Sequence, residues 1–135
     1  MGKNMTGTLY NKLLEIIERE EPFLHTDLKT EKEKIADRLK IPSKELDEMV
    51  RFYQDKTFIQ LLKTYRIEKA KEMLADPELE DVKIIEIAFN TGFGNLWDFN
   101  LYFKEVADVN PTEYRAFHKN FKKVTGLTPM EYKMQ

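Results

Sequence analysis

Residues 99–115 read FNLYFKEVADVNPTEYR, and residues 117–133 follow the same pattern as FHKNFKKVTGLTPMEYK. Phe99, Phe103, Lys104, Pro111, Glu113 and Tyr114 recur 18 residues later as Phe117, Phe121, Lys122, Pro129, Glu131 and Tyr132. Because 18 residues make five turns of an α-helix, apolar residues keep their helical phase in both copies. Each copy predicts an amphipathic helix, a short break and a helix that starts at proline. A local duplication is the simplest interpretation.

Apolar residues also recur at helical spacing through most of the remaining chain, and strand signals are nearly absent. The pattern predicts helices over residues 30–39, 57–75, 82–90, 95–107 and 111–125, with further helices before Pro22 and after Pro42. Thr30 is the predicted N-cap of its helix, and Thr57 that of the long one. Gly92 and Gly126 are predicted to end helices, since glycine adopts left-handed backbone geometry.

These helices predict an all-α fold with two helix-turn-helix units, at about residues 31–53 and 82–107. A long linker helix over about residues 57–75 joins them, and the repeated segment of about residues 111–135 adds a further helix. A length of 135 residues suits one domain over residues 1–135, although two very small domains sharing a helix fit the same length.

The charge is distributed unevenly along the chain. The whole sequence carries a formal net charge of −2, which is unusual for a non-specific nucleic-acid binder. Residues 114–135 nevertheless carry five basic residues and one acidic residue, a net charge of +4. An anionic partner is therefore expected to bind the C-terminal end.

Several function classes are excluded by what the sequence lacks. With no cysteine the chain has no disulfide, thiolate or zinc-finger chemistry, and no apolar run is long enough to cross a membrane. His25 and His118 are far apart and lack metal-ligand spacing, and there is no glycine-rich phosphate loop. We therefore expect a cytoplasmic protein that is not an enzyme and needs no metal or cofactor.

Helical periodicity alone favours an ordinary helical bundle over a DNA-reading protein, because helix-turn-helix geometry is common in proteins that never bind DNA. The order of four sequence motifs instead favours a DNA-binding protein. The stretches IADRLKIPSKEL, KTFIQLLKTYRIEKAKEML, IIEIAFNTGFGN and FNLYFKEVADVNPTEYR span Ile35 to Arg115. Together they resemble the C-terminal DNA-binding domain of AraC-family transcription regulators, and the closing motif occurs twice.

The resemblance implies two recognition helices that enter successive major-groove segments of one DNA site. In the first unit, Lys44, Asp47, Glu48 and Arg51 are expected to point outward. Lys44 and Arg51 are candidate phosphate contacts. Asp47 and Glu48 are expected to form a solvated acidic surface that repels DNA, although carboxylates can also accept a hydrogen bond from cytosine.

In the second unit, Trp97 and Leu101 occupy positions where the family usually carries polar groups. They are interpreted as buried helix-packing contacts, with the helix after Pro111 as the covering element. In this interpretation the second reading site would be masked or remodelled.

The second copy instead places basic side chains on one face of its helix. The candidate DNA-binding residues are therefore Lys44, Arg51, Asn95, Arg115, His118, Lys119, Lys122 and Lys123. Tyr114, Phe117 and Phe121 are expected to face the core, and Lys119 and Lys122 to face water. An ordinary basic surface fits the same residues equally well.

The predicted function is a sequence-specific transcription regulator output domain that binds double-stranded DNA, with RNA polymerase as a second candidate partner. The alternative is a helical interaction module that has lost specific DNA binding. In that case Trp97 and Leu101 would serve self-association or contact another protein.

Overall fold

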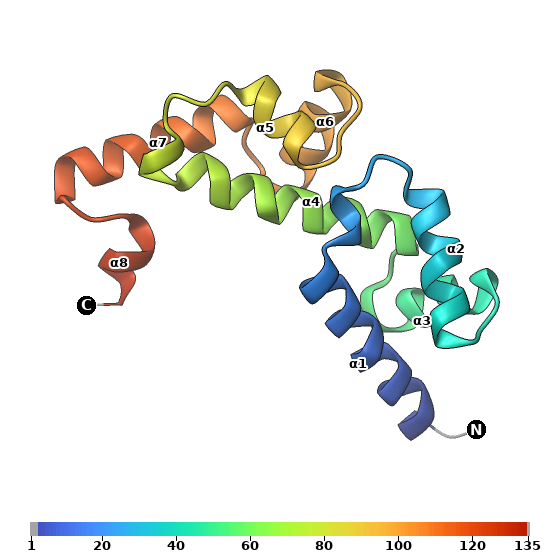
Figure 1. Ribbon diagram of the computed structural model, residues 1–135. Coiled ribbons are helices and arrows are strands. Elements are labelled where there is room, and N and C mark those ends of the chain that lie inside the picture. Colours follow the sequence, from blue (N-terminus) through green and yellow to red (C-terminus); the bar gives the residue numbers. More distant parts are fainter. Residues whose placement is uncertain (1–2, 135) are drawn as a thin grey trace. The chain divides into compact units, whose positions relative to one another are not determined.

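The computed structural model describes residues 3–134, with side chains from residue 7 onward, and this part of the chain contains helices and no strand. The α-helices are α1 (Lys3–Glu20), α2 (Leu28–Leu39), α3 (Ser43–Gln54), α4 (Phe58–Ala75), α5 (Ile84–Asn90), α6 (Leu96–Ala107), α7 (Pro111–Thr125) and α8 (Pro129–Lys133) (Figure 1). Two 3-10 turns, η1 (Pro22–Leu24) and η2 (Pro77–Leu79), bend the chain after α1 and α4. The predicted all-α fold is confirmed.

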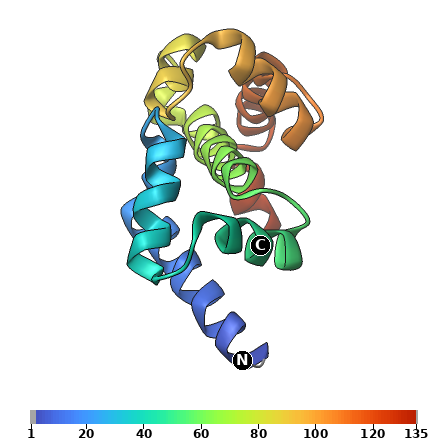
Figure 2. The ribbon, with the colours of Figure 1, turned by 90° about the vertical axis from the view of Figure 1, so that its right-hand side faces the viewer.

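The chain forms two compact units, one ending at Arg66 and the other starting at Ile67. The boundary falls inside α4, which is one continuous helix (Figures 1 and 2). Residues of its first half belong to one hydrophobic core and residues of its second half to the other. Each unit contains one helix-turn-helix: α2 and α3 in the first, α5 and α6 in the second.

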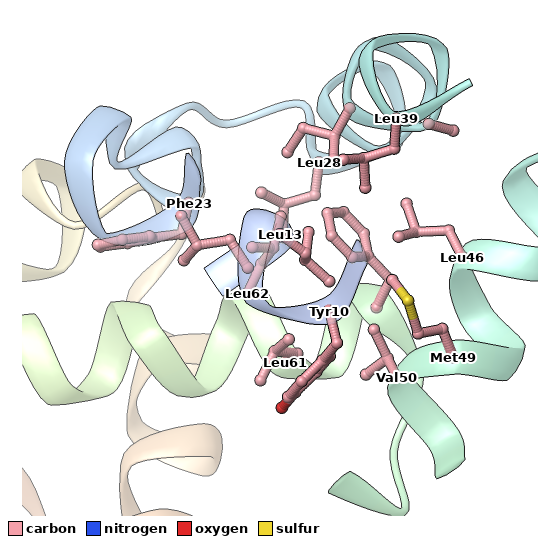
Figure 3. Packing of buried hydrophobic residues seen from close by; sticks show 14 residues of the cluster. Tyr10, Leu13, Phe23, Leu28, Leu39, Leu46, Met49, Val50, Leu61 and Leu62 are labelled. Atoms are coloured by element: carbon pink, nitrogen blue, oxygen red, sulfur yellow. The ribbon is translucent and has the colours of Figure 1, made fainter. Parts of the chain in front are cut away.

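The first unit is built around leucine, valine and aromatic side chains from α1, α2, α3 and the start of α4. Leu13, Leu46, Val50, Phe58 and Leu62 are completely buried. Figure 3 shows Leu13, Leu46 and Leu62 meeting from three different helices. Burying side chains of this size contributes about 1.5–3 kcal/mol each, so this cluster holds α2 and α3 at their mutual angle.

A buried arginine ties the η1 turn to α4. Arg66 donates from Nε to the Phe23 carbonyl at 2.6 Å and from Nη2 to the His25 carbonyl, also at 2.6 Å. Burial lowers the pKa of Arg66 to about 10, because the charged guanidinium loses hydration that neutral carbonyls only partly replace. The side chain therefore satisfies backbone acceptors that the turn would otherwise leave unpaired.

The second unit has an aromatic core. Phe99 and Phe103 of α6 are completely buried, as are Ile67 and Ala70 of α4 and Ile87 of α5. The residues on the inner side of α6 are thus those of the first copy of the repeat. They fix which side of α6 remains available to a partner.

Two helix starts differ from the sequence prediction. The N-cap of α2 is Asp27 and not Thr30, and the Asp27 carboxylate accepts the Thr30 backbone N–H at 3.1 Å. Thr30 adds its hydroxyl to the same carboxylate at 2.7 Å, so the predicted cap residue lies inside the helix. Helix α5 begins at Ile84 and not at Val82, after the extended residue Lys83.

The predicted starts and ends of the other elements are confirmed. Thr57 accepts the Gln60 N–H at 3.1 Å at the start of α4. Helix α7 is continuous from Pro111 to Thr125, with a capping box between Asn110 and Glu113 and a left-handed Gly126 at its end. These signals are local, which is why sequence alone located them.

Candidate nucleic-acid interface

The first helix-turn-helix has a tight turn between α2 and α3. Lys40 adopts the left-handed conformation at φ 59°, and its neighbour Ile41 donates its N–H to the Ala36 carbonyl at 3.1 Å. Pro42 then leads into α3, whose inner face is held by the buried core of the unit. The outer face of α3 is consequently presented to solvent.

Four residues were predicted on the outer face of α3, and three of them, Lys44, Glu48 and Arg51, are exposed. Lys44 and Arg51 are the candidate phosphate contacts. Asp47 differs from the prediction. One of its carboxylate oxygens accepts the Phe58 backbone N–H at 3.0 Å, and the other pairs with Lys32.

Asp47 therefore anchors the first turn of α4 and pairs a lysine of α2. The prediction that it belongs to a solvated acidic surface is wrong. The reason is long-range: its two partners lie 15 and 11 residues away in sequence, beyond the reach of a helical periodicity argument. Glu48 is the one acidic residue of the predicted pair that remains on the surface.

The second helix-turn-helix turns through a glycine. Gly92 has φ 96°, a value that L-residues rarely adopt, and its N–H bonds to the Phe89 carbonyl at 3.0 Å. Phe93 is buried in the core of the unit and donates its N–H to the Ala88 carbonyl at 3.0 Å. Since the aromatic ring is locked in the core, the turn sets the direction in which α6 leaves.

Asn95 is the N-cap of α6. Its side-chain oxygen accepts the Asp98 backbone N–H at 2.8 Å, and its amide nitrogen lies 3.2 Å from the Asp98 carboxylate. Asn95 is exposed, but its hydrogen-bonding groups are engaged within the first turn of the helix. The DNA contact predicted for Asn95 would therefore compete with its capping of α6.

The outer face of α6 carries the two apolar residues that were predicted to be buried. Trp97 is 77% exposed and Leu101 is 50% exposed, so the masking hypothesis is wrong for this chain by itself. Helix α7 is directed to the inner side of the unit, because the Tyr114 ring packs edge-to-face on Phe103 at 5.5 Å. Only the start of α7 borders Trp97.

A shallow hollow of about 410 Å³ lies over this outer face. It is lined by Trp97, Asn100, Leu101, Lys104, Asn110, Pro111 and Thr112. Asn100 and Lys104 were not among the predicted contacts. Both lie on the same face of α6 as Trp97, because they follow it by three and seven residues. Helical spacing in the sequence could therefore have identified them as neighbours of Trp97.

The basic residues of α7 line a second hollow of about 610 Å³. Arg115, His118, Lys119, Lys122 and Lys123 all border it, opposite Asp76 and Glu80 near η2. The structure thus brings together five of the eight predicted contacts. The acidic residues on the opposite wall make the charge of this hollow mixed.

These five basic side chains differ in accessibility. Lys119, Lys122 and Lys123 are exposed, which confirms the prediction for the first two. Arg115 is half-buried: Nη2 donates to the Leu79 carbonyl at 3.4 Å, and Nε has no hydrogen-bond partner among the described residues. His118 packs its ring on Tyr114 at 4.4 Å.

The predicted inner face of α7 is only partly correct. Tyr114 packs against the core, but Phe117 is 56% exposed and Phe121 is half-buried. Among the described residues, the core cluster of this unit includes Tyr114 but no residue from the second half of α7. Its contact is instead with α8, where the Tyr132 ring meets Phe121 at 5.4 Å.

Other chemistries find no support in the described part of the chain. The side chains described, those of residues 7–134, include no group of three acidic or histidine residues placed to hold a metal ion. His25 is paired with the buried Glu31 in the first unit, far in sequence from His118. None of the helices described combines the length and apolar character of a membrane span.

Comparison with known proteins matches these two units to one family. A family model described as a helix-turn-helix domain matches residues 35–116. The match includes the first copy of the repeat and stops before Phe117, the start of the second copy. No functionally curated protein matches the chain.

Three solved structures are similar to this chain. The C-terminal domain of AraT, a response regulator from Geobacillus stearothermophilus, is 32% identical with a TM-score of 0.61, over 72% of this chain and 76% of that one. The C-terminal domain of the two-component response regulator yesN from Fusobacterium nucleatum is 26% identical with a TM-score of 0.61, over 84% of this chain and 99% of that one. A Listeria innocua protein of unknown function shares the fold at 24% identity and a TM-score of 0.63, over 81% and 96% of the two chains.

The family match begins inside α2 and covers the turn after it, α3, α4 and the whole second helix-turn-helix. Together with the 32% identity to AraT, it agrees with the geometry of the tight turns before α3 and α6. The chain belongs to the AraC-type family of helix-turn-helix domains.

Proposed function

We propose that this chain is the DNA-binding output domain of a transcription regulator and recognises a specific sequence in double-stranded DNA. One observation carries the proposal: the second helix of each helix-turn-helix, α3 and α6, has its inner face locked in a core and its outer face exposed. An α-helix presented in this way fits the major groove of B-DNA, where base edges are read.

Residues of α3 and α6 would make the first set of contacts. Lys44 and Arg51 are exposed on α3, and each can neutralise a phosphate or donate to guanine. Asn95, at the start of α6, is placed where its amide could contact the backbone if it exchanges its bond to Asp98 for one to DNA. Glu48 is the acidic residue that opposes phosphate on α3.

Residues of α7 would make a second, sequence-independent set. Lys119, Lys122 and Lys123 are exposed, and no ion pair to an acidic side chain is recorded for them within residues 7–134. Arg115 lies beside them and would contribute positive potential more than direct contacts, since its side chain is half-buried, and His118 is half-buried next to it. All three lysines lie beyond the family match, so they would extend the footprint of the family domain.

Salt dependence of DNA binding tests the proposal. Neutralising each phosphate releases counterions, so the logarithm of affinity should fall steeply with the logarithm of salt concentration. The variant carrying Lys119→Glu and Lys122→Glu should bind all sequences more weakly and flatten the slope by roughly one unit per lost contact. Lys12→Glu, an exposed charge reversal on α1, is the control and should leave the slope unchanged.

The outcome separates two roles of the second copy. An unchanged slope in the double variant would show that α7 is a structural extension and that α3 and α6 supply the phosphate contacts.

Glu48→Gln should tighten binding to every sequence if its carboxylate only repels phosphate. Weaker binding confined to cytosine-containing sites would show that Glu48 reads a base.

A second candidate function is favoured by the exposed Trp97 and Leu101. These side chains could serve self-association or another protein partner, in which case binding would be apolar and nearly insensitive to salt.

In the DNA-binding role, RNA polymerase is the further partner that a bound regulator would have to recruit or exclude. Action on chromosomal DNA would also place the domain in the cytoplasm.

A further inference from the structure

Trp97 and Leu101 form an apolar pair at the centre of the outer face of α6. They are four residues apart, so their side chains lie one above the other on the same side of the helix. Polar groups surround them: Lys104 lies one turn further along, and Asn100 lies beside Leu101. The start of α7, with Asn110 as its N-cap, closes the border.

We infer that Trp97 and Leu101 recognise the 5-methyl groups of thymines in the major groove, which makes A·T base pairs the preferred target of α6. This inference rests on the proposed function. Thymine is the base that presents an apolar group at the floor of the major groove, and apolar side chains read it by direct contact. Trp97 and Leu101 therefore contribute to the base specificity of α6.

The polar border fits the same target. An A·T pair presents the adenine N7 acceptor and N6 donor beside the thymine methyl, and an asparagine amide matches that pair of groups with two hydrogen bonds. Asn100 is exposed on the same face as Trp97 and is placed for this contact. Lys104, further along the helix, has the charge to hold a phosphate.

The acidic group near the pair does not oppose this arrangement. Asp98 lies in the first turn of α6, where its carboxylate is 3.2 Å from the Asn95 amide nitrogen. The positive end of the helix dipole also lies at this turn and offsets part of the negative charge. Asp98 is thus an internal partner of the cap.

Area argues against self-association as the main purpose of the pair. Trp97 and Leu101 are two exposed apolar side chains, whereas a stable protein interface buries ~800 Å² per partner from roughly 20–30 residues. The neighbouring Lys104 would also have to be desolvated at a flat interface between two copies. A groove with alternating methyl, acceptor and phosphate groups matches this mixed surface better.

The experiment removes single methyl groups from the DNA. A duplex is first selected by the intact chain from a randomised pool, and each thymine is then replaced in turn by deoxyuridine, which pairs identically and lacks the 5-methyl. One or two replacements should weaken binding by about fourfold each, the value of one buried methyl-sized group. In Trp97→Ala or Leu101→Ala, the same replacements should cost less than about twofold.

Phe117→Ala is the matched control. It removes an exposed aromatic side chain from the same unit but from α7, so the uracil penalty should persist in full. Because Trp97 is 77% exposed, its substitution should leave the helix content unchanged, which circular dichroism verifies. A uracil penalty that persists equally in Trp97→Ala and Leu101→Ala would overturn the inference while leaving DNA binding intact.

Fluorescence gives a second readout, because Trp97 is the single tryptophan of the sequence. Its emission should change when the selected duplex is added and should be independent of protein concentration without DNA. A shift with protein concentration alone would favour self-association and overturn the inference. If selection from the randomised duplex pool enriched no sequence, the proposed sequence-specific DNA binding would be overturned, and the inferred recognition of thymine by Trp97 would fall with it.

Discussion

The two copies of the repeat share their local geometry but not their environment. The rings of Phe103 and Tyr114 meet edge-to-face at 5.5 Å, and the equivalent rings of Phe121 and Tyr132 do so at 5.4 Å. The two phenylalanines of each copy lie 5.7 and 5.9 Å apart, with interplanar angles of 47° and 44°. The same residues at the same spacing have produced the same local arrangement twice.

Burial separates the copies. Phe99 and Phe103 are completely buried, whereas Phe117 is 56% exposed and Tyr132 is 57% exposed. The first copy packs against residues of α4 and α5, whereas the core cluster found among the described residues includes none from the second copy. An amphipathic pattern therefore determines the shape of a segment, while its contribution to stability depends on whether another element supplies the matching surface.

The largest test of this contrast removes the same ring from each copy. Phe103→Ala should lower the free energy of unfolding by about 3–5 kcal/mol, because it leaves a cavity in a closed core. Phe121→Ala should lower it by less than about 1 kcal/mol, since that ring is already partly solvated. Urea denaturation followed by circular dichroism measures both, and equal losses would contradict the contrast.

The N-caps offer a second comparison. Asn110 and Thr128 form equivalent capping boxes, with Glu113 and Glu131 respectively. Asn110→Ala should lower the free energy of unfolding by about 1 kcal/mol, the usual value of an N-cap in a packed helix. Thr128→Ala should instead speed amide hydrogen exchange in α8 without a measurable change in global stability. A global loss in both variants would mean that α8 is part of the cooperative unit.

The C-caps allow a stabilising change. Asp108 ends α6 at φ 65°, and Gly126 ends α7 at φ 77°. Because a left-handed backbone costs an ordinary residue about 1 kcal/mol more than glycine, Asp108→Gly should raise the free energy of unfolding by about 0.5–1 kcal/mol. The reverse change, Gly126→Asp, should affect only the end of α7. Thermal unfolding measures the stability of both variants, and a loss of stability in Asp108→Gly would contradict the prediction.

The smallest expected effect is a dependence on pH in the second copy. The pKa of Glu131 lies below its ordinary value of 4.5, chiefly because its carboxylate accepts the Thr128 backbone N–H. A lowered pKa in the folded state means that the stabilisation is present above the ordinary value and is lost as pH falls through the folded pKa. NMR shifts of α8 should report this loss on acid titration, and Glu131→Gln should abolish the pH dependence.

The sequence predicted features that depend on neighbours within one or two turns. The start of α7 at Asn110 and its end at Gly126 are examples, since each needs only a side chain or backbone geometry at that place. The two helix-turn-helix units followed from the helical periodicity and the turn signals between the helices, and the order of four motifs gave their resemblance to a family. The Asp27 cap of α2 was missed because Thr30, three residues later, is an equally good cap by residue type.

The features that the sequence did not predict depend on distant residues. Asp47 lies on the outward row of α3 by periodicity, yet its carboxylate reaches the start of α4 and Lys32 of α2. Trp97 was expected in a core because large apolar residues are usually covered, but α7 packs on the opposite side through Tyr114. Which face of a helix becomes a surface is decided by the tertiary neighbours of that helix, which no local pattern specifies.

The capping boxes at the starts of α7 and α8, each preceded by a left-handed residue, have a consequence for how such a chain can grow. Each of these two helices begins with side chains that satisfy its first N–H groups, and each follows a left-handed residue, Asp108 or Gly126, that has already ended the preceding helix. A repeat that carries its own helix end and its own helix start can be added to a finished domain without taking hydrogen bonds from it. The cost of such an insertion is small, so a newly added copy is free to acquire charges, as α7 has done, without risk to the parent fold.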